Sequence, residues 1–125
     1  MLIDIDVLYN SIDMAPPARR TELLKGTLEL LILRTLAQEP RHGLAIAERI
    51  EQITRGTFVV KPGSLFPALH RLEQDGSIAG AWGESENGYR VKTYRLEPAG
   101  RRQLERETEQ WKRIVLAMGQ VLEST

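Results

Sequence analysis

The segment from Lys61 to Ile78 and the basic segment that follows it constrain the fold more than any other part of the chain. In the first segment, Leu65, Leu69 and Leu72 recur at helical spacing and make one apolar stripe. The opposite side of the same helix carries Ser64, Pro67, His70, Arg71 and Gln74. This pattern predicts a helix that packs on one face and is free to contact another molecule on the other.

The ends of this helix and the hairpin after it are also readable. Pro62 suits a first helical turn, where its missing N–H would be unpaired anyway, and Gly76 can end the helix in a left-handed conformation. Residues 78–82 and 89–96 suit two strands, which the Asn87-Gly88 turn reverses. A helix that leads into a basic hairpin is typical of a winged helix-turn-helix DNA-binding domain.

Two further helices are predicted before this unit. Thr21 can cap a leucine-rich helix that runs to Ala37 and is apolar on more than one face, as central helices are. Residues 44–53 form a second helix with apolar residues inward and charged residues outward. We expect helix two, a long connection and helix three to form the helix-turn-helix.

Pro98 begins a last helix of roughly 25 residues, about 37 Å long at 1.5 Å per residue. Steps of four and three residues define a heptad seam on it: Leu104, Thr108, Trp111, Val115, Met118 and Leu122. A small domain cannot cover so long a seam from one side, so we predict a homodimer. Trp111 suits dimer packing, and its flat ring can also form the wall of an effector pocket.

Length and charge set the organisation. With 125 residues the chain suits one domain with appendages: an arm at 1–20 with little order, a winged-helix domain at 21–97 and a dimerisation helix at 98–125. The arm can equally be a strand added to a partner or a mis-set start. The fold class we predict is mainly α (α+β). Because 17 basic and 17 acidic residues cancel, DNA binding must depend on local clusters such as residues 90–102.

Several classes of protein are disfavoured. Without cysteine, and with His42 and His70 as the two histidines, the chain offers too few ligands for zinc, and we expect no metal and no cofactor. It has no glycine-rich phosphate loop and no nucleophile elbow, so we expect no enzyme. No apolar run reaches the roughly 20 residues of a membrane span, and no signal peptide is recognisable, which favours the cytoplasm.

Several motifs, in the right order over about residues 22–122, resemble the PadR-like transcriptional regulators, closest to the short form with one C-terminal helix. They are Leu24-Lys-Gly-Thr-Leu28, His42-Gly43, the segment 63–73, and Lys92-Thr-Tyr-Arg-Leu96 with Ala99-Gly-Arg101. The resemblance implies a winged-helix dimer that represses or modulates transcription, sometimes with an effector pocket near the dimer helices. Phe66, Leu44 and Glu97 depart from the family's usual Tyr, aromatic residue and Thr, and Phe66 lacks the hydroxyl that can reach the DNA backbone.

Nine residues are therefore candidates for DNA contact: Lys25, Lys61, Ser64, Phe66, Pro67, His70, Arg71, Arg90 and Lys92. Arg71 can bind guanine in a bidentate manner, and phosphate would relieve the unfavourable position of Lys25 and Lys61 at helix beginnings. Arg90 and Lys92 of the wing can neutralise phosphates or lie beside the minor groove. The alternative is a merely solvated helix face and a hairpin that is basic for solubility.

The resulting hypothesis is a cytoplasmic, homodimeric repressor that binds double-stranded DNA at a pseudo-palindromic operator, with recognition helices about 34 Å apart. A small aromatic or hydrophobic effector near Trp111 can control it. The alternative is a winged-helix assembly module that binds a partner protein without sequence-specific DNA binding. The zero net charge and the acidic arm favour that alternative.

Overall fold

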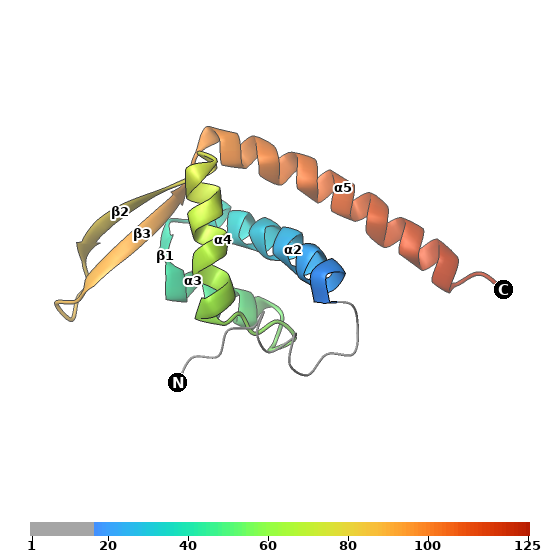
Figure 1. Ribbon diagram of the computed structural model, residues 1–125, viewed down its shortest axis with the longest axis horizontal. Helices are drawn as coiled ribbons and strands as arrows, with labels where there is room; N and C mark the ends of the chain where they lie inside the picture. Colours follow the sequence, from blue (N-terminus) through green and yellow to red (C-terminus); the bar gives the residue numbers. More distant parts are fainter. Residues whose placement is uncertain (1–16) are drawn as a thin grey trace.

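The computed structural model describes residues 17–125, with side chains from residue 26 onward, and the prediction for the first sixteen residues lies outside them. Within residues 17–125, three helices come before the hairpin and one follows it (Figure 1). The elements are α2 (Pro17–Gln38), β1 (Arg41–His42), α3 (Gly43–Ile53), α4 (Pro62–Gln74), β2 (Ile78–Glu84), β3 (Arg90–Leu96) and α5 (Pro98–Leu122). The order agrees with the predicted winged helix-turn-helix.

The core lies where α2, α3 and α4 meet the base of the sheet. The fully buried large side chains are Ile32, Leu33, Ile46, Leu65, Leu69, Leu72 and Ile78. Three of them are the predicted stripe of α4, which is thus confirmed. Each such side chain contributes roughly 1.5–3 kcal/mol on burial, so the stripe fixes α4 against the other two helices.

The hairpin β2–β3 projects away from the helices and forms the wing (Figure 1). Its strands are antiparallel and stay in register from Ile78 opposite Leu96 to Glu84 opposite Arg90. Gly88 has φ of 80°, which confirms the predicted reversal there. The two-residue strand β1, which the sequence pattern did not predict, adds to the other edge of β3 and gives the order β1-β3-β2.

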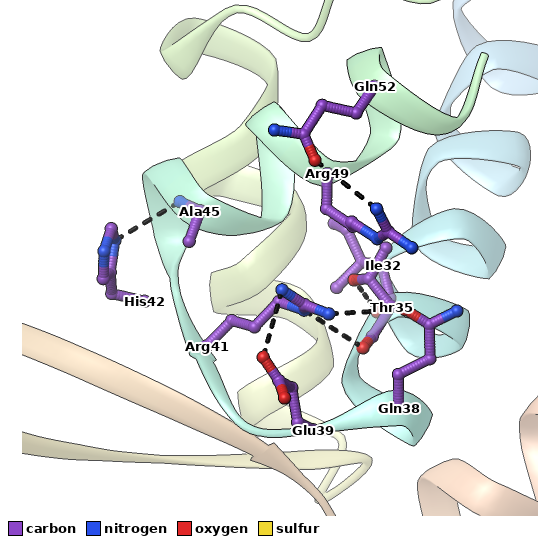
Figure 2. A network of polar contacts seen from close by, with 9 residues as sticks. All are labelled: Ile32, Thr35, Gln38, Glu39, Arg41, His42, Ala45, Arg49 and Gln52. Carbon is purple, nitrogen blue, oxygen red and sulfur yellow. Dashed lines mark hydrogen bonds and ion pairs between the residues drawn. The ribbon is translucent and has the colours of Figure 1, made fainter.

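Arg41 holds the connection between α2 and α3 in place (Figure 2). Its Nε donates to the Thr35 carbonyl at 3.4 Å, and its terminal nitrogens reach Gln38 and Glu39 at the same distance. His42 is the N-cap of α3, where its Nδ1 accepts from the Ala45 N–H at 3.3 Å. These contacts fix where α3 begins relative to the end of α2.

Helix α2 begins at Pro17, so the predicted start at Thr21 is wrong. Pro17 suits the first position of a helix, and the Ala-Arg-Arg segment after it favours helix. Because Thr21 lies inside the helix, it does not cap it. The helix therefore includes the last residues of the arm predicted at 1–20.

Helix α5 starts in close contact with the domain. A side chain at Gly100 would overlap the Ser77 carbonyl oxygen and approach Leu96 Cδ1 to 2.8 Å, so only glycine fits there. Beyond this point α5 packs along α2, and its C-terminal end runs free of the other elements (Figure 1). The predicted long C-terminal helix is present with 25 residues.

Candidate nucleic-acid interface

Helix α4 presents an open face beside the wing. Pro67, His70 and Gln74 are exposed on it, as the sequence pattern predicts, and Phe66 is 45% exposed. Lys61 is the N-cap, is half-buried and makes no side-chain capping bond. In the first turn of α4, Pro62 has no N–H, and the Ser64 and Leu65 N–H groups donate to the Lys61 carbonyl at 3.0 Å, so Gly63 has the backbone N–H that an anion beside Lys61 could accept from.

Ser64 and Arg71 do not lie free on this face. The Ser64 hydroxyl oxygen is buried and lacks a hydrogen-bond partner among the described residues. Arg71 donates from Nε to Glu29 Oε1 of α2 at 2.8 Å, and its side chain is 35% exposed. The sequence pattern predicts that Ser64 and Arg71 face solvent, because helical spacing shows only which face of α4 a residue occupies. It does not show that α2 extends far enough to contact Arg71.

The wing carries a stack of cations and aromatic rings on the side that faces α4. The Arg90 guanidinium lies 4.6 Å from the centre of the Trp82 ring, and Trp82 is 58% exposed. Such a contact is worth about 0.5–1 kcal/mol at an exposed site. Arg90 is thus held in place while its charge stays accessible.

Lys92 is not at the tip and is not free. Its Nζ donates to Glu73 Oε1 of α4 at 2.8 Å and lies 5.4 Å from the centre of the Tyr94 ring. The hydrogen bond to Glu73 raises the pKa of Lys92, and burial raises the pKa of the Tyr94 hydroxyl. The hairpin end also carries the carboxylates of Glu84 and Glu86, and Glu84 lies directly opposite Arg90 in the strand register.

A groove of about 450 Å³ separates α4 from the wing. The residues that line it come from β1, α3, α4 and both wing strands, and they are apolar or basic apart from Glu73: His42, Gly43, Leu44, Phe66, His70, Glu73, Trp82, Arg90, Val91, Lys92 and Tyr94. Gly43 makes room for the Phe66 ring, since a Cβ there would lie 2.9 Å from Phe66 Cε1. The groove thus brings together Phe66, His70, Arg90 and Lys92 from the predicted set.

Three residues of this interface do not stand out in the sequence. The sequence does not single out Trp82, Glu73 or Glu29. Once the strand register is known, Trp82 can be placed opposite Lys92 and close to Arg90 on the neighbouring strand. The side chain of Lys25, which the sequence predicts as a DNA contact, lies outside the described residues.

The predicted seam of α5 passes from buried to exposed. Leu104 is buried and Thr108 is half-buried, whereas Trp111, Val115, Met118 and Leu122 are 40%, 53%, 56% and 76% exposed. Ile114, Leu116 and Val121 add to the exposed apolar surface. An exposed apolar stripe as long as the one from Trp111 to Leu122 is typical of an interaction site.

A second cavity, of about 360 Å³, lies between α2 and α5. Trp111 and Ile114 supply apolar walls, and Glu29 and Glu107 supply carboxylates. Among the described residues, no three His, Asp or Glu side chains gather as metal ligands. Within the same residues, no helix has the length and apolarity needed to cross a bilayer.

Comparison with known proteins identifies the family. The model of the Transcriptional regulator PadR-like family matches residues 32–106, from the core of α2 to the start of α5. The chain belongs to this family.

Individual transcriptional regulators are similar to this chain in sequence and structure. A transcriptional regulator from Mycobacterium tuberculosis is 34% identical over 80 residues, which cover 64% of this chain and 71% of that one. A PadR family regulator from Eggerthella lenta is 28% identical with a TM-score of 0.72, covering 95% of this chain and 99% of that one. A PadR family regulator from Clostridium difficile is 30% identical with a TM-score of 0.67, covering 76% and 97%.

Membership confirms the predicted winged-helix fold and the resemblance. This PadR-like protein is a DNA-binding transcriptional regulator and not an enzyme, because the family consists of transcriptional regulators. Dimerisation is typical of the family.

Proposed function

We propose that this PadR-like protein is a repressor that binds a pseudo-palindromic operator as a homodimer. The main support is the open face of α4 with Phe66, Pro67 and His70, which lies beside a wing that displays Arg90. A helix of this kind fits the major groove, and a wing reaches the flanking backbone. As a regulator of transcription it is proposed to act in the cytoplasm.

The proposed contacts with DNA are assigned from which side chains of α4 and the wing are accessible. His70, Pro67 and Phe66 contact base edges or the backbone, while Lys61 and the Gly63 N–H in the first turn of α4 hold phosphate. Because α2 begins at Pro17, Lys25 is not at a helix beginning, and the reason for expecting phosphate there no longer holds. Arg90 contacts phosphate beside the wing. Arg71 can bind guanine only after it leaves Glu29, so its contribution to base recognition requires that ion pair to open.

The dimer forms through α5. The exposed apolar side chains from Trp111 to Leu122 pack against the same helix of a second copy, which removes them from water and holds two α4 helices at a fixed separation. A pair of recognition helices about 34 Å apart meets successive major grooves on one side of the DNA.

A small aromatic or hydrophobic effector is proposed for the cavity between α2 and α5. The cavity volume of about 360 Å³ is within the range of small-molecule sites, and Trp111 offers a flat apolar wall. Binding there would change the angle between the two C-terminal helices and so the distance between the recognition helices.

The second candidate function is a winged-helix module that binds a partner protein. Two observations favour it: the net charge is zero, and two of the predicted DNA-binding cations, Arg71 and Lys92, are neutralised within the chain. A protein interface would respond weakly to salt, whereas DNA binding through phosphates is strongly salt-dependent.

Selection of bound duplexes from a random DNA pool tests the proposal. We expect an inverted repeat with half-sites about 10 base pairs apart, as the dimer geometry requires. A salt titration on the selected duplex should then give a log–log slope of about −0.9 for each phosphate neutralised. A pool without enrichment, or an affinity that does not change with salt, would support the protein-binding module instead.

A further inference from the structure

Lys92 is held by groups from three elements. Its ammonium donates to Glu73 Oε1 in the last turn of α4 at 2.8 Å. It also faces two aromatic rings, Tyr94 of β3 at 5.4 Å and Trp82 of β2 at 5.9 Å from their centres. The side chains of Lys92 and Glu73 are 25% and 29% exposed, so this ion pair is largely removed from solvent.

Gly80 provides the space that this arrangement needs. It pairs with Tyr94 across the hairpin and lies next to the ion pair. A Cβ at this position would overlap Lys92 Cε and would lie 3.2 Å from both Glu73 Oε2 and the Tyr94 ring. The absent side chain at residue 80 is therefore part of the contact between the wing and α4.

This contact joins the two parts of the interface. Glu73 is one turn after His70 on α4, and Lys92 is on the same strand as Arg90. The hairpin otherwise extends away from the helices (Figure 1). Because Lys92 lies opposite Trp82 in the outer half of the hairpin, a link from Lys92 to α4 determines the direction in which Trp82 and Arg90 point relative to the open face of α4.

We propose that Glu73, Lys92 and Gly80 are positioning residues that set the angle between the wing and the recognition helix, and that Lys92 does not bind phosphate. The proposal rests on the proposed DNA-binding function. A phosphate contact by Lys92 would leave the Glu73 carboxylate half-buried without its partner, which is costly. Arg90, exposed on the same strand, is the cation of the wing that reaches DNA.

The first experiment measures the wing angle without DNA. Because the chain has no cysteine, Gln52→Cys on α3 and Glu86→Cys at the wing tip allow two spin labels on the full chain, both at exposed positions. Labelled protein is mixed with excess unlabelled protein so that only distances within one protomer are measured. We expect one narrow distance distribution in the parent protein, and a broader or shifted one after Glu73→Gln or Gly80→Ala.

Gly83→Ala is the matched control. Gly83 lies on the same strand as Gly80 and nothing is within 4 Å of its added Cβ, so the same chemical change leaves the ion pair intact. Its distance distribution should equal that of the parent. If Glu73→Gln and Gly80→Ala also leave the distribution unchanged, the proposal is wrong, whatever the protein binds.

The second experiment measures operator affinity by fluorescence anisotropy at several salt concentrations, with thermal unfolding as a check that each variant is folded. We expect Glu73→Gln and Gly80→Ala each to weaken binding about tenfold, and their combination to be no worse than either alone. On a shortened duplex that lacks the flanking base pairs under the wing, the variants and the parent should bind alike. Lys92→Met should weaken binding without changing the slope of affinity against salt.

A phosphate-binding Lys92 would behave differently in the same measurements. Glu73→Gln should then tighten binding because it frees the ammonium, and Lys92→Met should reduce the magnitude of the salt slope by about 0.9 for each phosphate that Lys92 neutralises. Either result overturns the proposal. If the parent protein binds no DNA at all, the proposed function fails, while the spin-label distances still decide whether Glu73 and Lys92 fix the wing.

Discussion

Helices α4 and α5 both carry an apolar stripe at helical spacing, yet the two stripes have opposite environments. Leu65, Leu69 and Leu72 of α4 are fully buried within the domain. On α5, Leu104 is buried, but exposure reaches 76% at Leu122. Helical periodicity therefore identifies an apolar face, and the fold is needed to show whether the same chain buries that face, as it does for α4, or leaves it exposed, as on most of α5.

The cations of the interface show the same contrast. Arg71 and Lys92 have carboxylate partners within the chain, in Glu29 and Glu73. Arg90 lies on an exposed indole ring and keeps its charge available. Arg71 and Lys92 therefore stabilise contacts within the domain, whereas Arg90 can form an ion pair with another molecule.

The largest expected effect is a loss of stability on substitution in the buried stripe of α4. Leu69→Ala should lower the free energy of unfolding by about 2–5 kcal/mol, because it removes buried methyl groups and leaves a cavity. Urea denaturation measures it. The neighbouring His70→Ala should change stability by less than about 0.5 kcal/mol, since His70 is exposed. Equal losses at the two positions would contradict the assignment of faces on α4.

Substitution in the exposed stripe of α5, which we propose packs against a second copy, should affect assembly rather than folding. Val115→Glu places a carboxylate in the proposed dimer seam and should weaken dimerisation by about 3 kcal/mol, because the charge has no partner there. Analytical ultracentrifugation should show monomers whose far-UV circular dichroism is near that of the parent.

Gln120→Glu is the control for this variant, because it adds the same charge to the same part of α5 at an exposed residue outside the seam. It should remain a dimer. A parent protein that is monomeric at micromolar concentration would refute the dimer itself.

The ion pair between Arg71 and Glu29 provides a smaller test. Glu29→Gln should lower stability by about 1 kcal/mol or less, because the Arg71 side chain is 35% exposed and solvent weakens the pair. If a freed Arg71 reads guanine, the same change should improve discrimination at one operator position, measured on single-base variants of the duplex. No change in discrimination would show that Arg71 acts only within the domain.

The smallest effect is expected for the free cation of the wing. Arg90→Gln should leave stability almost unchanged and should reduce the magnitude of the salt slope by about 0.9 for each phosphate that Arg90 neutralises in the parent, equally for all sequences. Anisotropy titrations on the operator and on an unrelated duplex measure it. A weakening confined to the operator would indicate base recognition instead.

Much of the fold could be predicted because it depends on local patterns. The α4 stripe, the limits of α4 at Pro62 and Gly76, the turn at Gly88 and the long α5 follow from spacing and from Pro and Gly chemistry. The start of α2 was misplaced because a plausible cap at Thr21 competed with an earlier favourable start at Pro17. Strand β1 has two residues, too few to produce a pattern.

The candidate site was less predictable, since it depends on which side chains meet in space. Arg71 and Glu29 are 42 residues apart and Lys92 and Glu73 are 19 apart, so neither ion pair appears in any local spacing. Sequence reasoning could identify cations on suitable elements but could not tell the paired from the free. That distinction separates Arg90 from Lys92 and determines which of them can meet DNA.

The tight junction at Gly100 has a mechanical consequence. With its Cα against the Ser77 backbone, α5 meets the end of α4 and the base of the wing without a flexible joint. Helix α5, which is about 37 Å long, therefore moves with the rest of the domain as one rigid unit. A tilt of a few degrees at its C-terminal end also tilts helix α4 and the wing. A bulkier residue at position 100 would overlap the Ser77 carbonyl and would have to displace the start of α5 from the domain.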